Sequence, residues 1–333
     1  MPRLERERTM KTRMTELFGI QYPIMCGPML HICNAELCAA VSEAGALGNL
    51  TSANYNSPEE LRMAIRKVRE LTDKPFSVNI TLMPSIRLTD EILEQFFKVA
   101  AEEHVPVVDV SGALATKYMD MMHNAGVKMI HKVGAVRHAK SVEKAGYDAV
   151  VVAGFEAGGF PLDDDVTSMV LTPCAADNVS IPVITTGGMG DGRSLMAALS
   201  LGASGMMMAS RFVATKEVNI HQNVKDELVN RKETDTTLVC KTLHMQGRAL
   251  KNETTDSILA LEASGQATDE IYKLMSGARS KIAWETGDVQ ATNFMVGQSI
   301  GLIHDCPTVA ELIQNIVTQA EKVTEVNNAY ING

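Results

Sequence analysis

The sequence of 333 residues lacks the features that mark several large classes of protein. It has only six cysteines and no CxxC pair, which argues against a disulfide framework and against a zinc site. No apolar run reaches the roughly 18 residues of a transmembrane helix. Charges recur through Arg13, where a signal peptide would be apolar. These absences predict a reduced, cytoplasmic protein without a metal site.

An excess of positive charge is also missing. The chain has 31 Lys and Arg against 40 Asp and Glu, a formal net charge of −9. Nucleic-acid binding needs clustered basic side chains to neutralise phosphates, so nucleic acid is not an expected partner, and neither is a membrane. The expected partners are a small-molecule substrate and a second copy of the chain in a homodimer. With 45% hydrophobic and 21% charged residues, the composition is that of a globular protein with a large core.

Short apolar runs alternate with amphipathic segments, a pattern typical of parallel sheets built from βα units. The runs are continuous rather than alternating, as expected for strands covered on both faces. The predicted strands are Pro23–Cys26, Leu47–Ser52, Phe76–Leu82, Val105–Ser111, Lys128–Val133, Ala149–Gly154, Pro182–Gly188 and Gly205–Ser210. Eight strands by residue 210 predict an α/β fold of the (β/α)8 TIM-barrel type, with a doubly wound open sheet as the alternative.

Helical patterns fill the intervals between these strands, and the chain changes character after Lys216. Ser57-Pro58 places a cap and a proline at one helix start. The segment 221–289 holds helical runs and the single tryptophan, Trp284. We therefore predict a barrel formed by residues 14–220 and 290–333, with 221–289 inserted as a helical cap over the substrate.

The seventh and eighth strands end in sequences suited to a phosphate. In barrels of this kind phosphate is typically held after strands 7 and 8. Thr186-Gly187-Gly188 offers backbone N–H groups without a blocking Cβ, and Ala209-Ser210 adds further donors. The alternative is that both are ordinary tight turns. The glycines do not fit the G-x-G-x-x-G pattern, so a Rossmann nucleotide site is disfavoured.

Three other strand ends carry residues that a core does not require. Asn79 and Thr81 stand in the third strand, and Lys132 stands in the fifth. A lysine on a central barrel strand is seldom buried without a partner; the alternative places Lys132 in solvent just past its strand. The glycine-rich loop 154–161 after the sixth strand would let a flat ligand approach closely.

These strand ends together resemble the nitronate monooxygenase (2-nitropropane dioxygenase) family. The resemblance runs in order from about residue 14 to 325. It is carried by Pro23-Ile24-Met25, Gly27-Pro28-Met29, Val78-Asn79-Ile80-Thr81, Ile130-His131-Lys132, Gly154-Phe155-Glu156-Ala157-Gly158-Gly159, Thr185-Thr186-Gly187-Gly188 and Met295-Val296-Gly297-Gln298-Ser299. The family includes NAD(P)H:quinone reductases and resembles the FMN-dependent enoyl-ACP reductases. The resemblance implies a TIM barrel that binds FMN non-covalently under a helical cap.

The resemblance also implies a role for each matching residue. Lys132 would contact the cofactor and steady negative charge on the N1–O2 side of the reduced flavin. Asn79 and Thr81 would bond the flavin's polar edge, and Gly158 would lie against the ring. The full set of implied FMN-binding residues is Gly27, Pro28, Met29, Asn79, Thr81, Lys132, Gly158, Thr186, Gly187, Gly188, Ala209, Ser210, Gln298 and Ser299.

One position departs from the family. The loop after strand 6 ordinarily carries a histidine that serves as catalytic base or substrate contact, and here that residue is Phe160. A phenyl ring cannot accept a proton, and a positioned base contributes roughly 10²–10⁴-fold. Phe160 instead adds an apolar wall suited to a hydride acceptor. A proton donor for such a reaction would be His31, or else His131 or Tyr118, although His31 also fits an ordinary loop histidine.

These observations leave three hypotheses open. The first is an FMN oxidoreductase that passes hydride from NAD(P)H to an apolar quinone or enoyl acceptor. The second is a nitronate monooxygenase that uses a different base and oxygen. The third is a flavin-binding barrel without catalysis. Glu156 and Asp163-Asp164-Asp165 resemble a paired-carboxylate site, but we interpret them as structural acids at a helix start.

Overall fold

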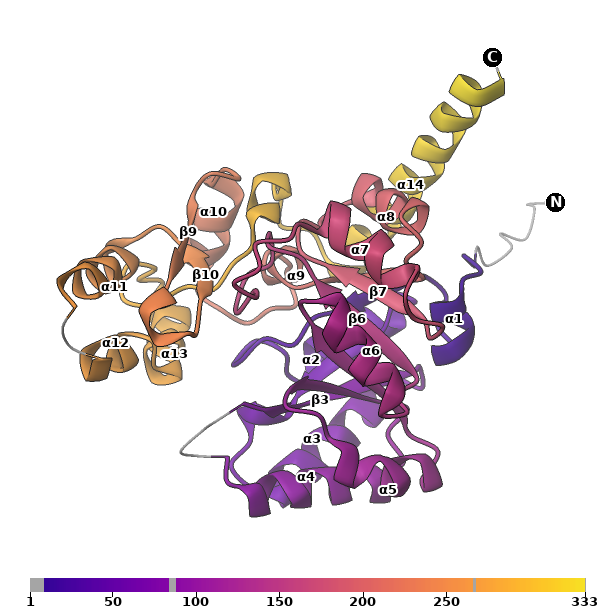
Figure 1. Ribbon diagram of the computed structural model, residues 1–333, viewed down its shortest axis with the longest axis horizontal. Helices are drawn as coiled ribbons and strands as arrows, with labels where there is room; N and C mark the ends of the chain where they lie inside the picture. Colours follow the sequence, from indigo (N-terminus) through magenta and orange to yellow (C-terminus); the bar gives the residue numbers. More distant parts are fainter. Residues whose placement is uncertain (1–8, 84–87, 266–267, 333) are drawn as a thin grey trace.

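The predicted strands form one closed parallel barrel in the computed structural model, which describes residues 9–83, 88–265 and 268–332 (Figure 1). The strands pair in the order β1-β8-β7-β6-β5-β4-β3-β2. A parallel bridge between Met25 and Leu47 closes the ring, with the Leu47 N–H donating to the Ile24 carbonyl at 2.9 Å. The TIM-barrel prediction is therefore confirmed, and the open sheet is excluded. The strands are β1 (Ile24–Cys26), β2 (Gly48–Thr51), β3 (Phe76–Leu82), β4 (Val107–Gly112), β5 (Lys128–Val133), β6 (Ala149–Ala153), β7 (Val183–Thr186) and β8 (Gly205–Met208).

Helices on the outside of the barrel connect these strands. They begin where the sequence supplies caps: the Ser57 hydroxyl accepts from the Glu60 N–H at the start of α3, and Pro58 occupies the first turn. The barrel helices are α2 (Ala35–Glu43), α3 (Pro58–Leu71), α4 (Asp90–Glu102), α5 (Met119–Asn124), α6 (Val136–Lys144), α7 (Ser168–Ala176), α8 (Gly192–Ser200) and α14 (Val309–Asn332), with the 3₁₀ turns η1 (Ser52–Asn54) and η2 (Thr116–Tyr118). The last helix packs on α8, and its final turns extend beyond the barrel (Figure 1).

The barrel interior is closed at its amino-terminal end by the short helix α1 (Arg13–Phe18). Met14 and Phe18 pack against inward-facing Val107, Ile130 and Ile184 in one buried cluster. Alternate residues of the same strands pack outward against the helices. Because the amino-terminal end is plugged, only the carboxyl ends of the strands can open to a ligand.

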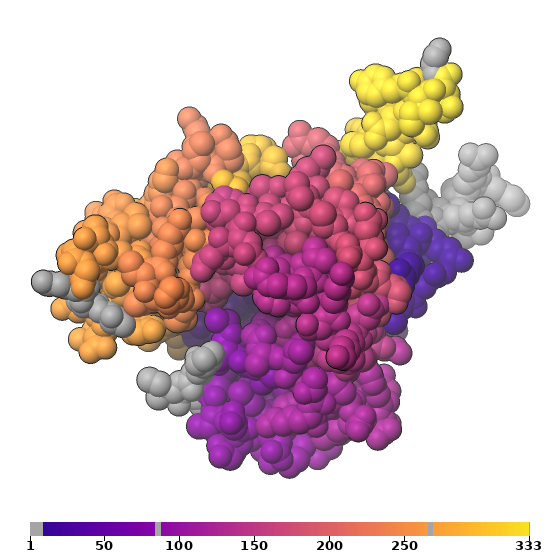
Figure 2. Space-filling model, viewed as in Figure 1, coloured from indigo at the N-terminus to yellow at the C-terminus, as the bar shows by residue number. Residues whose placement is uncertain are grey.

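The segment after β8 forms a lobe beside the barrel, seen in orange in Figures 1 and 2, with a hollow where the two meet. It contains helices, as predicted, and also an antiparallel pair of strands in which Gly247 faces Val239 and which the helical prediction missed. The elements are α9 (Ser210–Val213), α10 (Gln222–Asn230), β9 (Thr236–Val239), η3 (Lys241–Leu243), β10 (Gly247–Leu250), α11 (Glu253–Ser264), α12 (Thr268–Leu274), α13 (Gly277–Thr286) and η4 (Gln298–Leu302). Among the described residues, no helix combines the length and apolar character needed to cross a bilayer.

Candidate functional site

A cavity of about 850 Å³ opens at the carboxyl ends of the strands, between the barrel and the lobe that follows β8. It is where active sites of TIM barrels lie. Most of the predicted site residues line it: Gly27, Pro28, Met29, Lys132, Gly158, Phe160, Thr186, Gly187, Gly188, Ala209, Ser210 and Ser299. From the lobe, Met275, Gly277, Ser280 and Trp284 complete the wall.

The turn after β7 carries two glycines whose backbone N–H groups are unpaired within the described residues. Gly187 and Gly188 have φ of +96° and +74°, a left-handed conformation that side chains other than glycine rarely adopt. Within the described residues their N–H groups donate no hydrogen bond, although both residues line the cavity. Next to this turn, the Ser210 hydroxyl accepts from the Gly297 N–H at 3.1 Å. Successive unpaired N–H groups can bind phosphate, and phosphate binding at this turn stays a prediction.

The loop after β6 packs tightly on the segment that follows residue 294. A Cβ on Gly158 would lie 2.6 Å from the Gly297 nitrogen, and the Gln298 N–H donates to the Glu156 carbonyl at 2.9 Å. Glycine at 158 is therefore required by this backbone contact, whatever lies in the cavity. Gln298 is held by its backbone here and is not a lining residue, so its predicted contact with FMN stays a prediction.

Glu156 has a structural role, as we interpreted. Its carboxylate accepts from the Ser168 N–H at 2.9 and 3.1 Å and caps the start of α7. The prediction that Asp163, Asp164 and Asp165 form the start of this helix is wrong. These acids lie in the loop before it, because the helix begins only at Ser168.

The hairpin of β9 and β10 holds the same loop from the other side. Arg248 and Gly159 pair through two backbone hydrogen bonds of 2.7 and 3.2 Å. The Arg248 guanidinium is buried, donates to the Phe155 carbonyl at 3.0 Å, and lies 4.4 Å from the centre of the Phe155 ring. Phe160, the residue after Gly159, keeps 45% of its surface exposed and lines the cavity. The loop is therefore fixed at both ends while Phe160 stays available to a ligand.

The polar residues predicted on the third and fifth strands differ in their relation to the cavity. Asn79 and Thr81 do not line the cavity wall. The Asn79 amide instead donates to the Asp109 carboxylate at 3.2 Å and to the Ser111 hydroxyl at 3.2 Å. The side chain lies below the wall because the barrel packs around it, leaving Asn79 only 2% exposed. Their implied bonds to a flavin stay predictions, whereas Lys132 is half-buried and does line the cavity.

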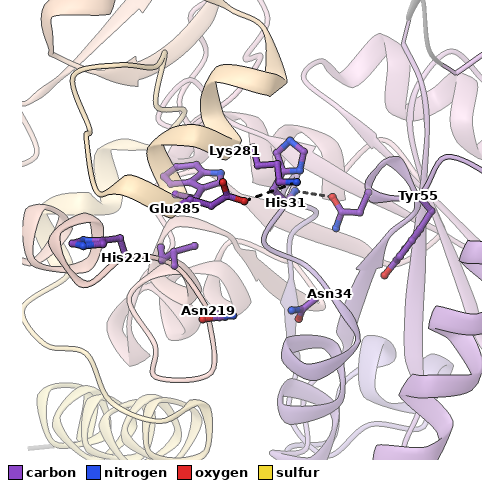
Figure 3. A pocket seen from close by; sticks show the side chains of 10 residues that line it. His31, Asn34, Tyr55, Asn219, His221, Lys281 and Glu285 are labelled. Carbon is purple, nitrogen blue, oxygen red and sulfur yellow. Dashed lines mark hydrogen bonds and ion pairs between the residues drawn. The ribbon is translucent and has the colours of Figure 1, made fainter.

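His31 lines a second pocket of about 560 Å³ rather than the main cavity (Figure 3). The Nε2 atom of its ring lies 3.0 Å from the Gly277 carbonyl oxygen. Its backbone N–H donates to the side-chain oxygen of Asn54 at 2.7 Å. In Figure 3, His31 and Tyr55 approach from the barrel side, and Lys281 and Glu285 approach from the other. His31 thus connects the barrel to α13, which favours the loop-histidine interpretation over a role as proton donor.

The two other candidate proton donors are poorly placed. His131 borders the cavity, yet it is 2% exposed and packs edge-on against Tyr147 in the layer between strands and helices. Burial lowers its pKa to about 4, so it is neutral near pH 7. Tyr118 is buried and stacks on Phe97 at 4.0 Å, away from the cavity lining.

Sequence reasoning missed two buried charged residues next to the site, Asp109 and Arg248. Asp109 interrupts the apolar run Val107-Val108-Asp109-Val110, and an acid in a strand buried on both faces is a signal that could have found it. Arg248 gives no such local signal, because its importance comes from pairing with Gly159, far away in the sequence.

Comparisons with known proteins extend these observations. The family model described as nitronate monooxygenase matches residues 11–319. A protein of Rhodococcus jostii named (3aS,4S,5R,7aS)-5-hydroxy-7a-methyl-1-oxo-octahydro-1H-indene-4-carboxyl-CoA dehydrogenase is 34% identical, over 94% of this chain and 97% of its own. A probable nitronate monooxygenase of Staphylococcus aureus is 29% identical over 95% and 99%. The solved structure of FabK from Thermotoga maritima matches with a TM-score of 0.89 and 36% identity, covering 97% of this chain and all of that one.

Proposed function

The chain belongs to the nitronate monooxygenase family, and from that membership we propose that it is an FMN-dependent oxidoreductase that passes a hydride from NAD(P)H to an apolar acceptor of the enoyl or quinone type. Family membership makes it an oxidoreductase of a flavin-dependent family. The donor, the acceptor and the binding residues are our proposal. We further propose that residues 221–289 act as the substrate-covering subdomain.

The residues of the cavity fit FMN. The unpaired N–H groups of Gly187 and Gly188 would receive the phosphate. Met29 and Met207, whose polarisable thioethers suit a flat ring, would contact the apolar part of the flavin. Lys132 supplies a cation for its polar edge. When bound, FMN supplies a two-electron carrier that takes hydride from one substrate and gives it to another.

The observation that carries the proposal is Phe160 at the position of the family's histidine. Its exposed ring makes the cavity wall apolar at the place where a base would act on a nitronate. Of the ionisable groups among the described lining residues, His131 is buried and Glu156 is engaged in capping α7, which leaves Lys132 and His138. An acceptor that needs hydride and an apolar surface suits this wall better than a substrate that must lose a proton to a base.

The name of one relative supports a substrate of the acyl-thioester class. The Rhodococcus relative is named for a fused-ring carboxyl-CoA, an apolar group on a long polar carrier. The cavity here could hold such an apolar group under the cap, since typical ligand pockets measure about 300–1,000 Å³. We therefore place α,β-unsaturated acyl thioesters first among the enoyl acceptors to be tested.

The test begins with the absorbance spectrum of the purified protein and with anaerobic addition of NADH or NADPH. We expect a yellow protein that bleaches with one of the two donors and recovers its colour when crotonyl-CoA or a benzoquinone is added. A protein that refuses FMN, or that binds it and is bleached by neither donor, would refute the proposal. The second of those results is the expected behaviour of a binding barrel without catalysis.

Nitronate oxidation is the competing function, favoured by the name of the matching family model and by the Staphylococcus relatives. Oxygen uptake with propyl-2-nitronate distinguishes it. We expect negligible uptake by the natural protein, a gain of about tenfold or more in Phe160→His, and none in the matched variant Phe160→Leu. Rapid uptake by the natural protein would show that another base serves the reaction.

A further inference from the structure

The barrel interior is polar on one side and apolar on the other. The strand register shows which residues point inward: along β6, β7 and β8 these are Ala149, Val151, Ile184 and Met207, which pack in the central apolar cluster. Along β2, β3 and β4 the inward residues are mostly polar, with Val107 the apolar exception: Asn49, Thr51, Ser77, Asn79, Thr81, Asp109 and Ser111. The polar side is therefore localised beneath one part of the cavity floor rather than spread around the ring.

Asp109 is the only acidic side chain in this polar group. It is 0% exposed, and its Oδ2 accepts from the Asn49 amide and the Asn79 amide, each at 3.2 Å. Its Oδ1 has no hydrogen-bond partner within the described residues. A buried carboxylate with an unpaired oxygen is unfavourable unless a positive charge lies nearby.

The nearby positive charge is Lys132. The Cα of Asp109 pairs with that of Ile130 on the neighbouring strand, and Lys132 stands two residues further on the same inward face. Its charge acts on Asp109, favouring the ionised carboxylate against the effect of burial. Lys132 lines the cavity, and within the described part of the chain no carboxylate lies at ion-pair distance from its amine. The acid below and the cation above thus complement each other on adjacent strands.

We propose that Asp109 is the buried counter-ion of Lys132, a residue that acts through this lysine by offsetting its charge at the cavity floor, and that it thereby sets how strongly the site prefers reduced over oxidised flavin. The inference rests on the proposed FMN-dependent function. Asp109 is not among the residues that line the cavity, so its effect on a ligand there is exerted through Lys132.

The charge pair has a definite consequence for a bound flavin. Reduction adds negative charge to the flavin, which a cation at Lys132 stabilises and an anion at Asp109 opposes. In Asp109→Asn the lysine keeps its charge without a counter-ion, so reduced flavin should bind more tightly relative to oxidised flavin. Without Lys132 the pKa of the Asp109 carboxyl rises further, so less of it is charged and its replacement by asparagine should change the flavin's preference less.

The test is a double-mutant cycle read as the midpoint potential of bound FMN, titrated with dithionite at pH 8 so that no natural donor or acceptor is needed. We expect Asp109→Asn to raise the ratio of affinities for reduced and oxidised FMN about tenfold, which is about 30 mV for a two-electron couple. In the Lys132→Met background the same change should alter that ratio less than twofold. Ser77→Ala, an uncharged change in the same polar group, is the control and should leave the potential unchanged.

An unchanged potential in Asp109→Asn, or an equal rise with and without Lys132, would overturn the inference. A protein that binds no FMN would instead refute the proposed function. The pairing is still measurable in that protein from the unfolding free energies of the same four chains in urea. Additive effects of the two substitutions there would exclude the pair, and a coupling between them would retain it.

Discussion

Replacing Asp109 with asparagine should stabilise the protein at neutral and alkaline pH. The carboxyl group is wholly buried, and burial raises its pKa from 3.8 to about 6 despite Lys132. A folded-state pKa above the unfolded value means that the folded protein binds the proton more tightly. Stability from this group is therefore fully present below pH 3.8 and is lost as pH rises through 6. Asparagine is neutral throughout and has no such loss.

The magnitude follows from the size of the shift. About two pKa units at 1.36 kcal/mol each give about 3 kcal/mol in the limit of high pH. Between pH 4.5 and 8, where urea unfolding is practical, the part still to be lost is about 2 kcal/mol. Between pH 4.5 and pH 8, the unfolding free energy of Asp109→Asn should therefore rise by about 2 kcal/mol relative to that of the natural protein. Comparing two pH values cancels the constant effect of exchanging an oxygen for an amide group.

The measurement is urea unfolding followed by Trp284 fluorescence and circular dichroism at both pH values. Ser77→Ala is the matched control, because it alters a buried polar group that does not titrate. Its difference from the natural protein should be independent of pH. The reasoning would be refuted if the difference between Asp109→Asn and the natural protein did not change with pH, or if the variant became less stable than the natural protein on going from pH 4.5 to pH 8. Either result would mean that ionisation of Asp109 does not destabilise the folded protein.

Three further predictions concern the phosphate turn, the cap and a buried base. Gly187→Ala should weaken FMN binding at least tenfold in a fluorescence titration, whereas Gly126→Ala, which has the same left-handed strain in open space, should change it less than twofold. Arg248→Met should lower the free energy of unfolding by about 2 kcal/mol and make the cap sensitive to limited proteolysis. Arg231→Met, which removes a partly exposed ion pair within one helix, is the control and should do neither. Burial lowers the pKa of His131 from 6.5 to about 4, so the stability that this residue contributes is present above pH 6.5 and lost as the pH falls through 4. In urea unfolding, the natural protein should therefore lose about 3 kcal/mol more over this pH range than His131→Gln does.

The barrel could be predicted from the sequence because its signals are local. Most strands contain an apolar run with a glycine or proline near the boundary, and several helices begin at a side-chain cap, as at Ser57. The order of the strands then follows from the right-handed βα connections. The predicted strands agree with the observed ones to within about two residues at most ends.

The hairpin in the cap could not be predicted in the same way. β9 and β10 are each four residues long and show no regular alternation of apolar and polar residues. What stabilises them is the contact with the loop after β6, through Arg248 and Gly159, which are 89 residues apart in the numbering. A local pattern carries no information about such a partner, so the segment was predicted as helix from its neighbours.

The polar floor shows why a residue's type can be predicted more easily than its role. Asn79 was correctly singled out as a polar residue that the core does not require, but its amide serves Asp109 rather than the cavity. The family resemblance supplied a flavin contact for Asn79 and gave no reason for Asp109. The structure connects the two residues. The Asn79 amide binds one oxygen of the Asp109 carboxylate, and the other oxygen has no partner within the described residues. Lys132 stands on the neighbouring strand. A buried charge that costs stability and borders a ligand site is expected to have a functional reason, and here the cation that acts on it is Lys132, which lines the cavity.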